Sequence, residues 1–273
     1  PSLIPTYLLS RFTRNKVKVA LTGDGGDELF AGYDPFAALT FARIYKNIVP
    51  MALHKRLRRL VEYMPKSSAN MSFDFKVRRA LMGLDHQAPY WNPVWLAPLE
   101  PDDIIELFNE KIHIEDLYSE VLALWDEGQN KNLVDKTLEF YSNFYLPDNI
   151  LTKVDRAGML NGLEARSIFL DNDVVDFARR LPAEYKFDGR QRKKILKKAC
   201  SGLVPDKIIN RPKKGFGVPL KLWLSSLPLD SNNANVLKLN RNQVQSALDS
   251  HQLGQADHRL FLWSWSVLQF GKF

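Results

Sequence analysis

The chain has 273 residues, of which 45% are hydrophobic and 25% are charged, and its formal net charge is +7. This length allows one large domain or two smaller ones, and the composition is that of an ordinary globular protein. No apolar run approaches the roughly 20 residues of a membrane span, so we expect no membrane partner, whereas the positive charge favours anionic partners such as nucleotides.

Helical periodicity dominates the chain, with one clear exception near its start. Residues 3–14 are predicted to form a helix, and the short Val-rich stretch 16–22 is predicted to form a strand. Further helices are expected near residues 35–48, 51–63, 72–83, 115–126, 130–145, 150–160, 172–181, 190–200 and 256–270. Two stretches, 86–103 and 225–240, are predicted to be surface loops, and the tryptophan-rich segment 259–270 is predicted to be a buried core helix.

The predicted strand has no visible partner in the sequence. A lone strand cannot satisfy its own backbone donors and acceptors, because its hydrogen-bond partners come from other strands. The order helix, strand, glycine loop, helix is typical of one unit of a parallel sheet. Because the chain starts at Pro1 without a methionine or a signal peptide, we expect the neighbouring strands to lie upstream in a longer protein.

The glycine loop "TGDGGDELFAGYD" (22–34) is the first candidate site. It is not a P-loop, because no Gly-Lys-Ser/Thr follows, and it has neither the third glycine of a dinucleotide fingerprint nor the ligand spacing of an EF-hand. A loop at the carboxyl end of a strand is where open α/β sheets bind ligands. Its glycines would let backbone N–H groups approach a ligand closely, and either Asp24 or Asp27 could hold a hard cation. The alternative is a solvated acidic turn.

The second candidate is the stretch 145–173, which contains charged residues of both signs. These are Lys153, Asp155, Arg156, Glu164 and Arg166. Taken alone, they are better explained as exposed ion pairs that contribute little stability. Near the end of the stretch, Asp171 is predicted to be the N-cap of a new helix.

The third candidate is the basic loop "INRPKKGFGVPL" (209–220), which ends a run of ten Lys or Arg residues and one acid between Arg190 and Lys214. Cations on a glycine loop suit phosphate binding or the stabilisation of developing negative charge. The alternatives are a solvated basic loop and a nucleic-acid-binding module, although only Phe216 is close enough to stack on a base. Cys200 lies in the same run, and as the single cysteine it excludes an intramolecular disulfide and favours a structural role in a cytoplasmic protein.

Taken in this order, the three stretches resemble the synthetase domain of the glutamine-hydrolysing asparagine synthetases. The resemblance is carried by "LTGDGGDELFAGY", "LPDNILTKVDRAGMLNGLEARSIFLD" and "RPKKGFGVPL", and it is weakest at 50–130 and 225–255. It implies an α/β fold of the adenine-nucleotide α-hydrolase-like (ATP pyrophosphatase) type. Residues 1–273 would be the carboxyl-terminal part of that domain, mostly helical with a remnant of parallel sheet.

The resemblance also implies an activity and roles for individual residues. The parent would be an ATP-dependent and Mg²⁺-dependent ligase that adenylates aspartate and converts it to asparagine with ammonia from glutamine. Thr22 and Gly23 match the pair that contacts ATP, within a loop that includes Gly25 and Gly26. Asp24 matches an acidic position that handles the acyl-adenylate, Asp27 matches the aspartate that holds Mg²⁺, and Lys213 matches the lysine that stabilises charge on the intermediate. Further motif positions of substrate or structural importance are Lys153, Asp155, Glu164, Arg166 and Arg211.

Two departures from the family pattern leave alternatives open. Ile168 replaces the proline that usually precedes "FLD", so amidotransferases that form β-lactams or act on cell-envelope sugars remain candidates. The pyrophosphate-binding Ser-Gly-Gly-x-Asp-Ser loop and the amino-terminal glutaminase domain do not occur in this sequence. We therefore expect the chain alone to be inactive and the glutaminase domain to be its partner in the parent. A non-catalytic scaffold domain is a further alternative, and we expect no nucleic-acid partner.

Overall fold

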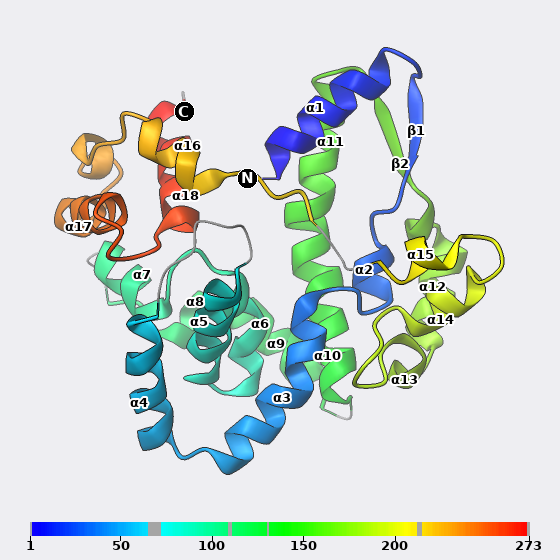
Figure 1. Ribbon diagram of the computed structural model, residues 1–273, viewed down its shortest axis with the longest axis horizontal. Helices are drawn as coiled ribbons and strands as arrows, with labels where there is room; N and C mark the ends of the chain where they lie inside the picture. The colour runs from blue at the N-terminus through cyan, green and yellow to red at the C-terminus, as the bar shows by residue number, and fades with distance from the viewer. Residues whose placement is uncertain (1, 65–71, 109–110, 130, 212–214, 272–273) are drawn as a thin grey trace. The chain divides into compact units, whose positions relative to one another are not determined.

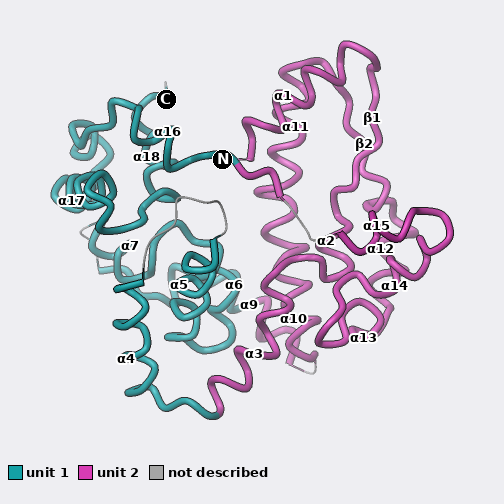
Figure 2. The backbone as a smooth tube through the Cα atoms, in the orientation of Figure 1, with its two compact units in different colours: residues 1, 48–123, 218–273 teal, residues 2–47, 124–217 magenta. Residues whose placement is uncertain are grey.

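The computed structural model describes residues 2–64, 72–108, 111–129, 131–211 and 215–271 (Figure 1). Most of these residues are helical, and the described strands form a two-stranded parallel sheet. The chain folds into two compact units (Figure 2). Residues 2–47 and 124–217 form the glycine-loop unit, and residues 48–123 and 218–273 form the Trp265 unit. Within the described part of the chain, no helix is both long and apolar enough to cross a bilayer.

The glycine-loop unit is built around the parallel strand pair. Helix α1 (Leu3–Arg14) precedes strand β1 (Val19–Thr22), and β1 pairs with β2 (Glu164–Ser167). α1 packs on α11 (Thr152–Met159), the helix that leads into β2 (Figure 1). The other elements are α2 (Gly26–Leu29), α3 (Asp34–Ile48), α10 (Leu133–Phe140), a π-helix (Tyr141–Leu151), a 3-10 turn (Ile168–Leu170), α12 (Asn172–Arg180), α13 (Ala183–Lys186), α14 (Lys194–Ala199) and α15 (Asp206–Ile209).

The predicted strand is confirmed as β1, and β2 corrects the expectation that no neighbouring strand lies in this sequence. The register sets Val19 beside Glu164 and Thr22 beside Ser167. Alternate residues of both strands are exposed, so β2 presents Glu164 and Arg166 on the same face as the exposed side chains of β1. Because the strands are parallel, the loops that follow Thr22 and Ser167 start at the same edge of the sheet.

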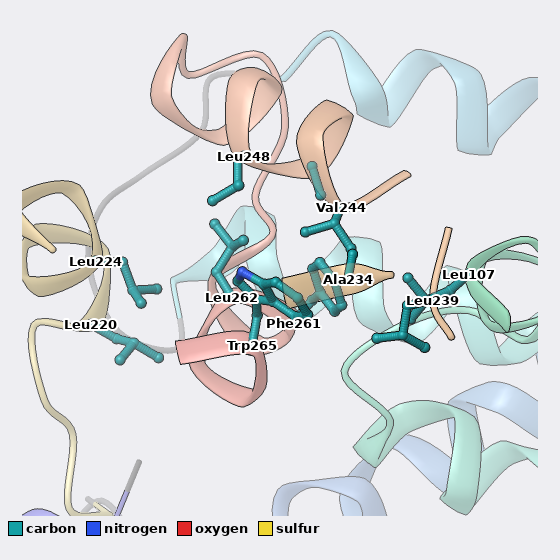
Figure 3. Close-up of a cluster of buried hydrophobic side chains, with 11 residues drawn as sticks. Leu107, Leu220, Leu224, Ala234, Leu239, Val244, Leu248, Phe261, Leu262 and Trp265 are labelled. Carbon is teal, nitrogen blue, oxygen red and sulfur yellow. The ribbon is translucent and has the colours of Figure 1, made fainter. Parts of the chain in front are cut away.

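The Trp265 unit has its own hydrophobic core (Figure 3). The predicted core helix is confirmed as α18 (Arg259–Phe270), in which Trp265 is fully buried and donates its indole N–H to the carbonyl of Asp230 (2.8 Å). Leu262 of the same helix and Val244 of α17 (Arg241–Gln252) are also buried in this cluster. The other elements are α4 (Met51–Glu62), α5 (Phe73–Leu84), α6 (Ala88–Leu96), α7 (Pro101–Phe108), α8 (Ile114–Leu117), α9 (Ser119–Glu127, which continues into the other unit), α16 (Leu220–Ser226) and a 3-10 turn (Asn232–Ala234).

One predicted surface loop is wrong. The stretch 86–103 contains α6 and the start of α7, and the side chains of Trp91, Val94 and Trp95 are buried. Its prolines look like loop punctuation, but burial of both indoles stabilises the helix in spite of Pro93 inside it. The other predicted surface loop, 225–240, is largely irregular as expected, but Ser231, Ala234 and Leu239 within it are buried.

Candidate functional site

The glycine loop lies at the carboxyl end of both strands. β1 ends at Thr22, and Gly23, Asp24 and Gly25 lead into the short helix α2. Gly25 has φ +85°, a left-handed conformation that glycine adopts without steric cost. The Ser167 hydroxyl at the end of β2 donates a hydrogen bond to the backbone carbonyl of Asp24. The two strand ends therefore hold the loop at the edge of the sheet where ligands bind in open α/β folds.

The glycines of the loop differ in what surrounds them. A Cβ added to Gly25 would collide with the side chain of Leu170, and one added to Gly26 would press against the ring of Phe169 at 3.0 Å. A Cβ added to Gly23 would meet no atom within 4 Å. Gly25 and Gly26 are thus required by packing against the 3-10 turn after β2, whereas Gly23 leaves its backbone open to a ligand.

Asp27, in the first turn of α2, forms an ion pair with Lys193. The Lys193 Nζ lies 2.7 Å from Asp27 Oδ1, and about a quarter of each side chain is exposed. Lys193 is the residue before α14, and its backbone N–H donates to the carbonyl of Phe30 (3.1 Å). Lys193 is not among the predicted site residues, because the basic run from Arg190 to Lys214 gives no sign of which cation turns inward.

Lys153 brings a second cation from α11. Its side chain is half-buried, and burial lowers its pKa, while the carboxylates of Asp24 and Glu28 oppose this shift. These two carboxylates belong to the glycine loop and α2, so α11 carries its lysine within electrostatic reach of the loop. Among the motif positions without an assigned role, Lys153 is the one that the structure associates with the loop.

A buried carboxylate and three tyrosines support the loop from inside the unit. Glu28 is 1% exposed and accepts a hydrogen bond from the hydroxyl of Tyr33. The Tyr33 ring stacks on Tyr141 of the π-helix at 4.7 Å and meets Tyr145 edge-on at 5.4 Å. Burial and the Glu28 carboxylate both raise the pKa of Tyr33, so its phenol stays protonated and keeps donating. No local pattern predicts this cluster, because Glu28 and Tyr33 of the loop are remote in the chain from Tyr141 and Tyr145.

The other predicted motif positions lie on the surface. Arg166 pairs with Glu164 (2.8 Å) on the exposed face of β2, and Arg156 lies 3.9 Å from Asp155 on α11. Both pairs are more than half exposed, as the alternative of exposed ion pairs predicted. Arg211 is also exposed, and Lys213 lies outside the described residues.

The basic run is partly used for ion pairs within the chain. Arg192 pairs with Asp34, and Lys194 pairs with Asp188 at 3.2 Å, in addition to the pair between Lys193 and Asp27. Backbone N–H groups at Gln191 and Arg190, and then the Lys194 ammonium, lower the pKa of Asp188 to about 2. Cations committed to such pairs are less available to phosphates, which counts against a nucleic-acid-binding module.

The described residues include a candidate metal ligand, Asp27. They contain no group of three or more His, Cys, Asp or Glu side chains that could hold a metal ion. Mg²⁺ does not need such a group, because it is usually held by one or two carboxylates together with substrate phosphates and water. Asp27 suits this role: its Oδ1 is buried against Lys193, yet the side chain is 26% exposed, so its accessible surface lies on its other atoms.

The comparisons with known proteins agree on one family. The family model described as asparagine synthase matches residues 1–270. Asparagine synthetase (glutamine-hydrolyzing) 1 of Bacillus subtilis is 27% identical over 97% of this chain and 42% of its own length. A putative asparagine synthetase (glutamine-hydrolyzing) of Mycobacterium tuberculosis is 29% identical over 97% of this chain and 40% of its own length.

Relatives with another kind of name are also similar to the chain. Amidase chry2 of Gibberella zeae is 23% identical over 85% of this chain and 38% of its own length. The chain spans about two fifths of the length of these relatives. No solved structure matches it.

Proposed function

Because the chain belongs to the asparagine synthase family, we propose that it forms part of an ATP-dependent ligase that converts aspartate to asparagine. Two relatives are named as glutamine-hydrolyzing asparagine synthetases, which supports aspartate as the acceptor and glutamine as the nitrogen source. The relative named as an amidase keeps other acceptors, including β-lactam precursors and cell-envelope sugars, as alternatives. The complete domain would have the ATP pyrophosphatase-type fold and would work with an amino-terminal glutaminase domain.

The proposed reaction has two steps. A carboxylate oxygen of aspartate attacks the α-phosphorus of ATP, and the bond to the bridging oxygen breaks, which releases pyrophosphate and leaves an acyl-adenylate. Ammonia then attacks the carbonyl carbon, loses a proton and displaces AMP, so that the amide remains. Negative charge develops on the phosphoryl oxygens in the first step, and preorganised cations are what stabilise it.

The residues of the glycine loop fit the requirements of the first step. Thr22 and the open backbone of Gly23 would contact ATP, and Gly25 and Gly26 hold the loop in place. Asp27 would hold Mg²⁺, which would supply positive charge to neutralise the leaving group. Asp24 would face the acyl-adenylate. The observation that carries the proposal is the open glycine loop at the edge of a parallel sheet, beside Asp27 in its ion pair with Lys193.

Lys213 is the proposed cation for the transition state. Charge that develops only in the transition state is worth more to stabilise than charge already present in the substrate. In the full-length protein, Lys213→Ala should therefore lower kcat by about 10²–10³-fold, the scale of losing one preorganised donor. The apparent KM for ATP should change by only a few-fold, and Lys213→Arg should restore activity partly, because a planar guanidinium replaces a compact ammonium poorly.

Lys214 is the matched control for this test. It carries the same charge at the next position, and we expect Lys214→Ala to be nearly silent in steady-state kinetics. A strong loss of kcat in Lys214→Ala together with full activity in Lys213→Ala would show that the wrong lysine has been assigned.

A further inference from the structure

We infer that Lys193 is a positioning residue that orients the Asp27 carboxylate for its metal ion. This inference rests on the proposed function, because it assumes that Asp27 binds the cation that accompanies the nucleotide. It assigns a task to a residue in the basic run that no motif singled out.

The side-chain geometry supports a fixed carboxylate. The Lys193 ammonium lies 2.7 Å from Asp27 Oδ1, and that oxygen is buried. One carboxylate oxygen is thus occupied by the lysine, while the accessible part of the side chain lies elsewhere. Gly32 makes room for this pair, because a Cβ there would overlap both the Asp27 carboxylate and the Lys193 side chain.

The backbone around Lys193 is also held in an unusual state. Lys193 has φ +53° and ψ +36°, a left-handed conformation that is uncommon for a residue with a side chain. Its N–H donates to the carbonyl of Phe30, and the neighbouring Arg192 guanidinium binds Asp34 and donates to the carbonyl of Gly32 (3.3 Å). Such conformations persist where surrounding contacts over-determine them, and they cluster at functional sites. Two consecutive residues, Arg192 and Lys193, therefore bind Asp27 and the segment that follows it.

The physical consequence is an ordered metal ligand. A carboxylate that already sits in one rotamer loses less entropy when it binds a cation, and hydrogen-bonded partners behind metal ligands commonly change metal affinity or activity 10–100-fold. Two other roles are possible for the same contact: Lys193 could compete with the cation for Asp27, or it could only tie α14 to the loop. Removing Lys193 should weaken metal binding if it orients Asp27, strengthen it if the lysine competes with the cation, and leave it unchanged if the lysine only ties α14 to the loop.

The test measures binding of Mn²⁺, as a stand-in for Mg²⁺, to the full-length protein with α,β-methylene-ATP, by electron paramagnetic resonance. Lys193→Met should weaken Mn²⁺ binding about 10–100-fold, the usual effect of losing such a partner. Lys194→Met is the matched control, because it removes the same charge at the next residue together with an ion pair to Asp188. Its Mn²⁺ affinity should stay within about twofold of the wild type, since its partner is not at the loop.

A second variant tests the same contact by a different change. Gly32→Ala displaces the pair without removing either charge, and it should weaken Mn²⁺ binding in the same direction. Unchanged or tighter Mn²⁺ binding in Lys193→Met, with Asp27→Asn still defective, would overturn the positioning role and leave the proposed function standing. Binding that is insensitive to Asp27→Asn would overturn the metal assignment itself, and the inference with it.

Discussion

Gly23 and Gly25 occupy the same loop under opposite constraints. Gly25→Ala places a side chain at φ +85° against Leu170, so it should destabilise the protein by more than about 1 kcal/mol. Gly23→Ala meets no neighbour, so its stability should change by less than about 0.5 kcal/mol, while its KM for ATP should rise about tenfold. Thermal unfolding and steady-state kinetics of the full-length variants test both. A stable Gly25→Ala, or a Gly23→Ala with unchanged KM, would contradict this division of roles.

Lys153 should cost the protein stability at neutral pH. Burial lowers its pKa, so between that value and the ordinary lysine value of about 10.4 the unfolded chain binds more protons than the folded one. The free energy of unfolding therefore rises with pH between these two pKa values. Below the lower one, the destabilisation caused by burying the charged Lys153 is fully present. Lys153→Met should be at least as stable as the wild type at pH 7 and should lose this advantage near pH 10.5.

Urea unfolding at the two pH values measures the difference, with the exposed Lys198→Met as the control for removing a charge. A Lys153→Met variant that is less stable than the wild type at pH 7 would show that Lys153 is a structural cation. If the variant is stable but inactive, the result assigns Lys153 to the substrate rather than to the structure, the two roles expected for this motif position.

At the scale of single elements, Asp171 is the sequence prediction that the structure confirms most directly. Its side chain accepts a hydrogen bond from the backbone N–H of Asp173 (3.0 Å) at the start of α12. Asp171→Ala should lower the free energy of unfolding by about 1 kcal/mol, the usual cost of losing an N-cap. Asp176→Ala removes the same charge from the exposed middle of α12, and urea unfolding should show a smaller loss. Equal losses of unfolding free energy in the two variants would show that Asp171 acts through its charge and not through its capping hydrogen bond.

The elements that sequence patterns predict are those whose apolar residues recur at helical spacing, even where these side chains are exposed, as Leu8 and Phe12 of α1 are. α1, α3, α4, α5, α12 and α18 lie close to their expected positions, because periodic apolar residues mark such helices. α6 shows no such periodicity, because residues 91–95 are all buried. β2 has no strand pattern of its own, because "EARS" is short and charged, and its stability comes from pairing with β1, which is remote in the chain.

Some residues of the candidate site can be predicted from the sequence and others cannot. Glycines and acids in one short loop can be recognised from residue chemistry, and the loop does lie at the edge of the sheet. Lys193, Tyr141 and Tyr145 reach the loop only through the tertiary fold. No local pattern distinguishes an inward lysine from its exposed neighbours.

At the scale of the whole molecule, the described site residues all belong to the glycine-loop unit. Its sheet has two described strands, with Leu21 of β1 73% exposed, whereas parallel sheets are normally covered on both faces. The chain also spans about two fifths of its relatives' length. We therefore propose that further strands and the pyrophosphate-binding loop come from other parts of the full-length protein.

We propose above all that the full-length protein joins a carboxylate to AMP before it forms an amide. Aspartate labelled with ¹⁸O in its side-chain carboxylate tests this directly, because the oxygen that attacks phosphorus leaves with AMP. The full-length protein, given ATP, Mg²⁺ and ammonia, should produce AMP that carries one ¹⁸O together with unlabelled pyrophosphate, whereas residues 1–273 alone should produce none. Formation of ADP and phosphate, or of asparagine with unlabelled AMP, would contradict the account.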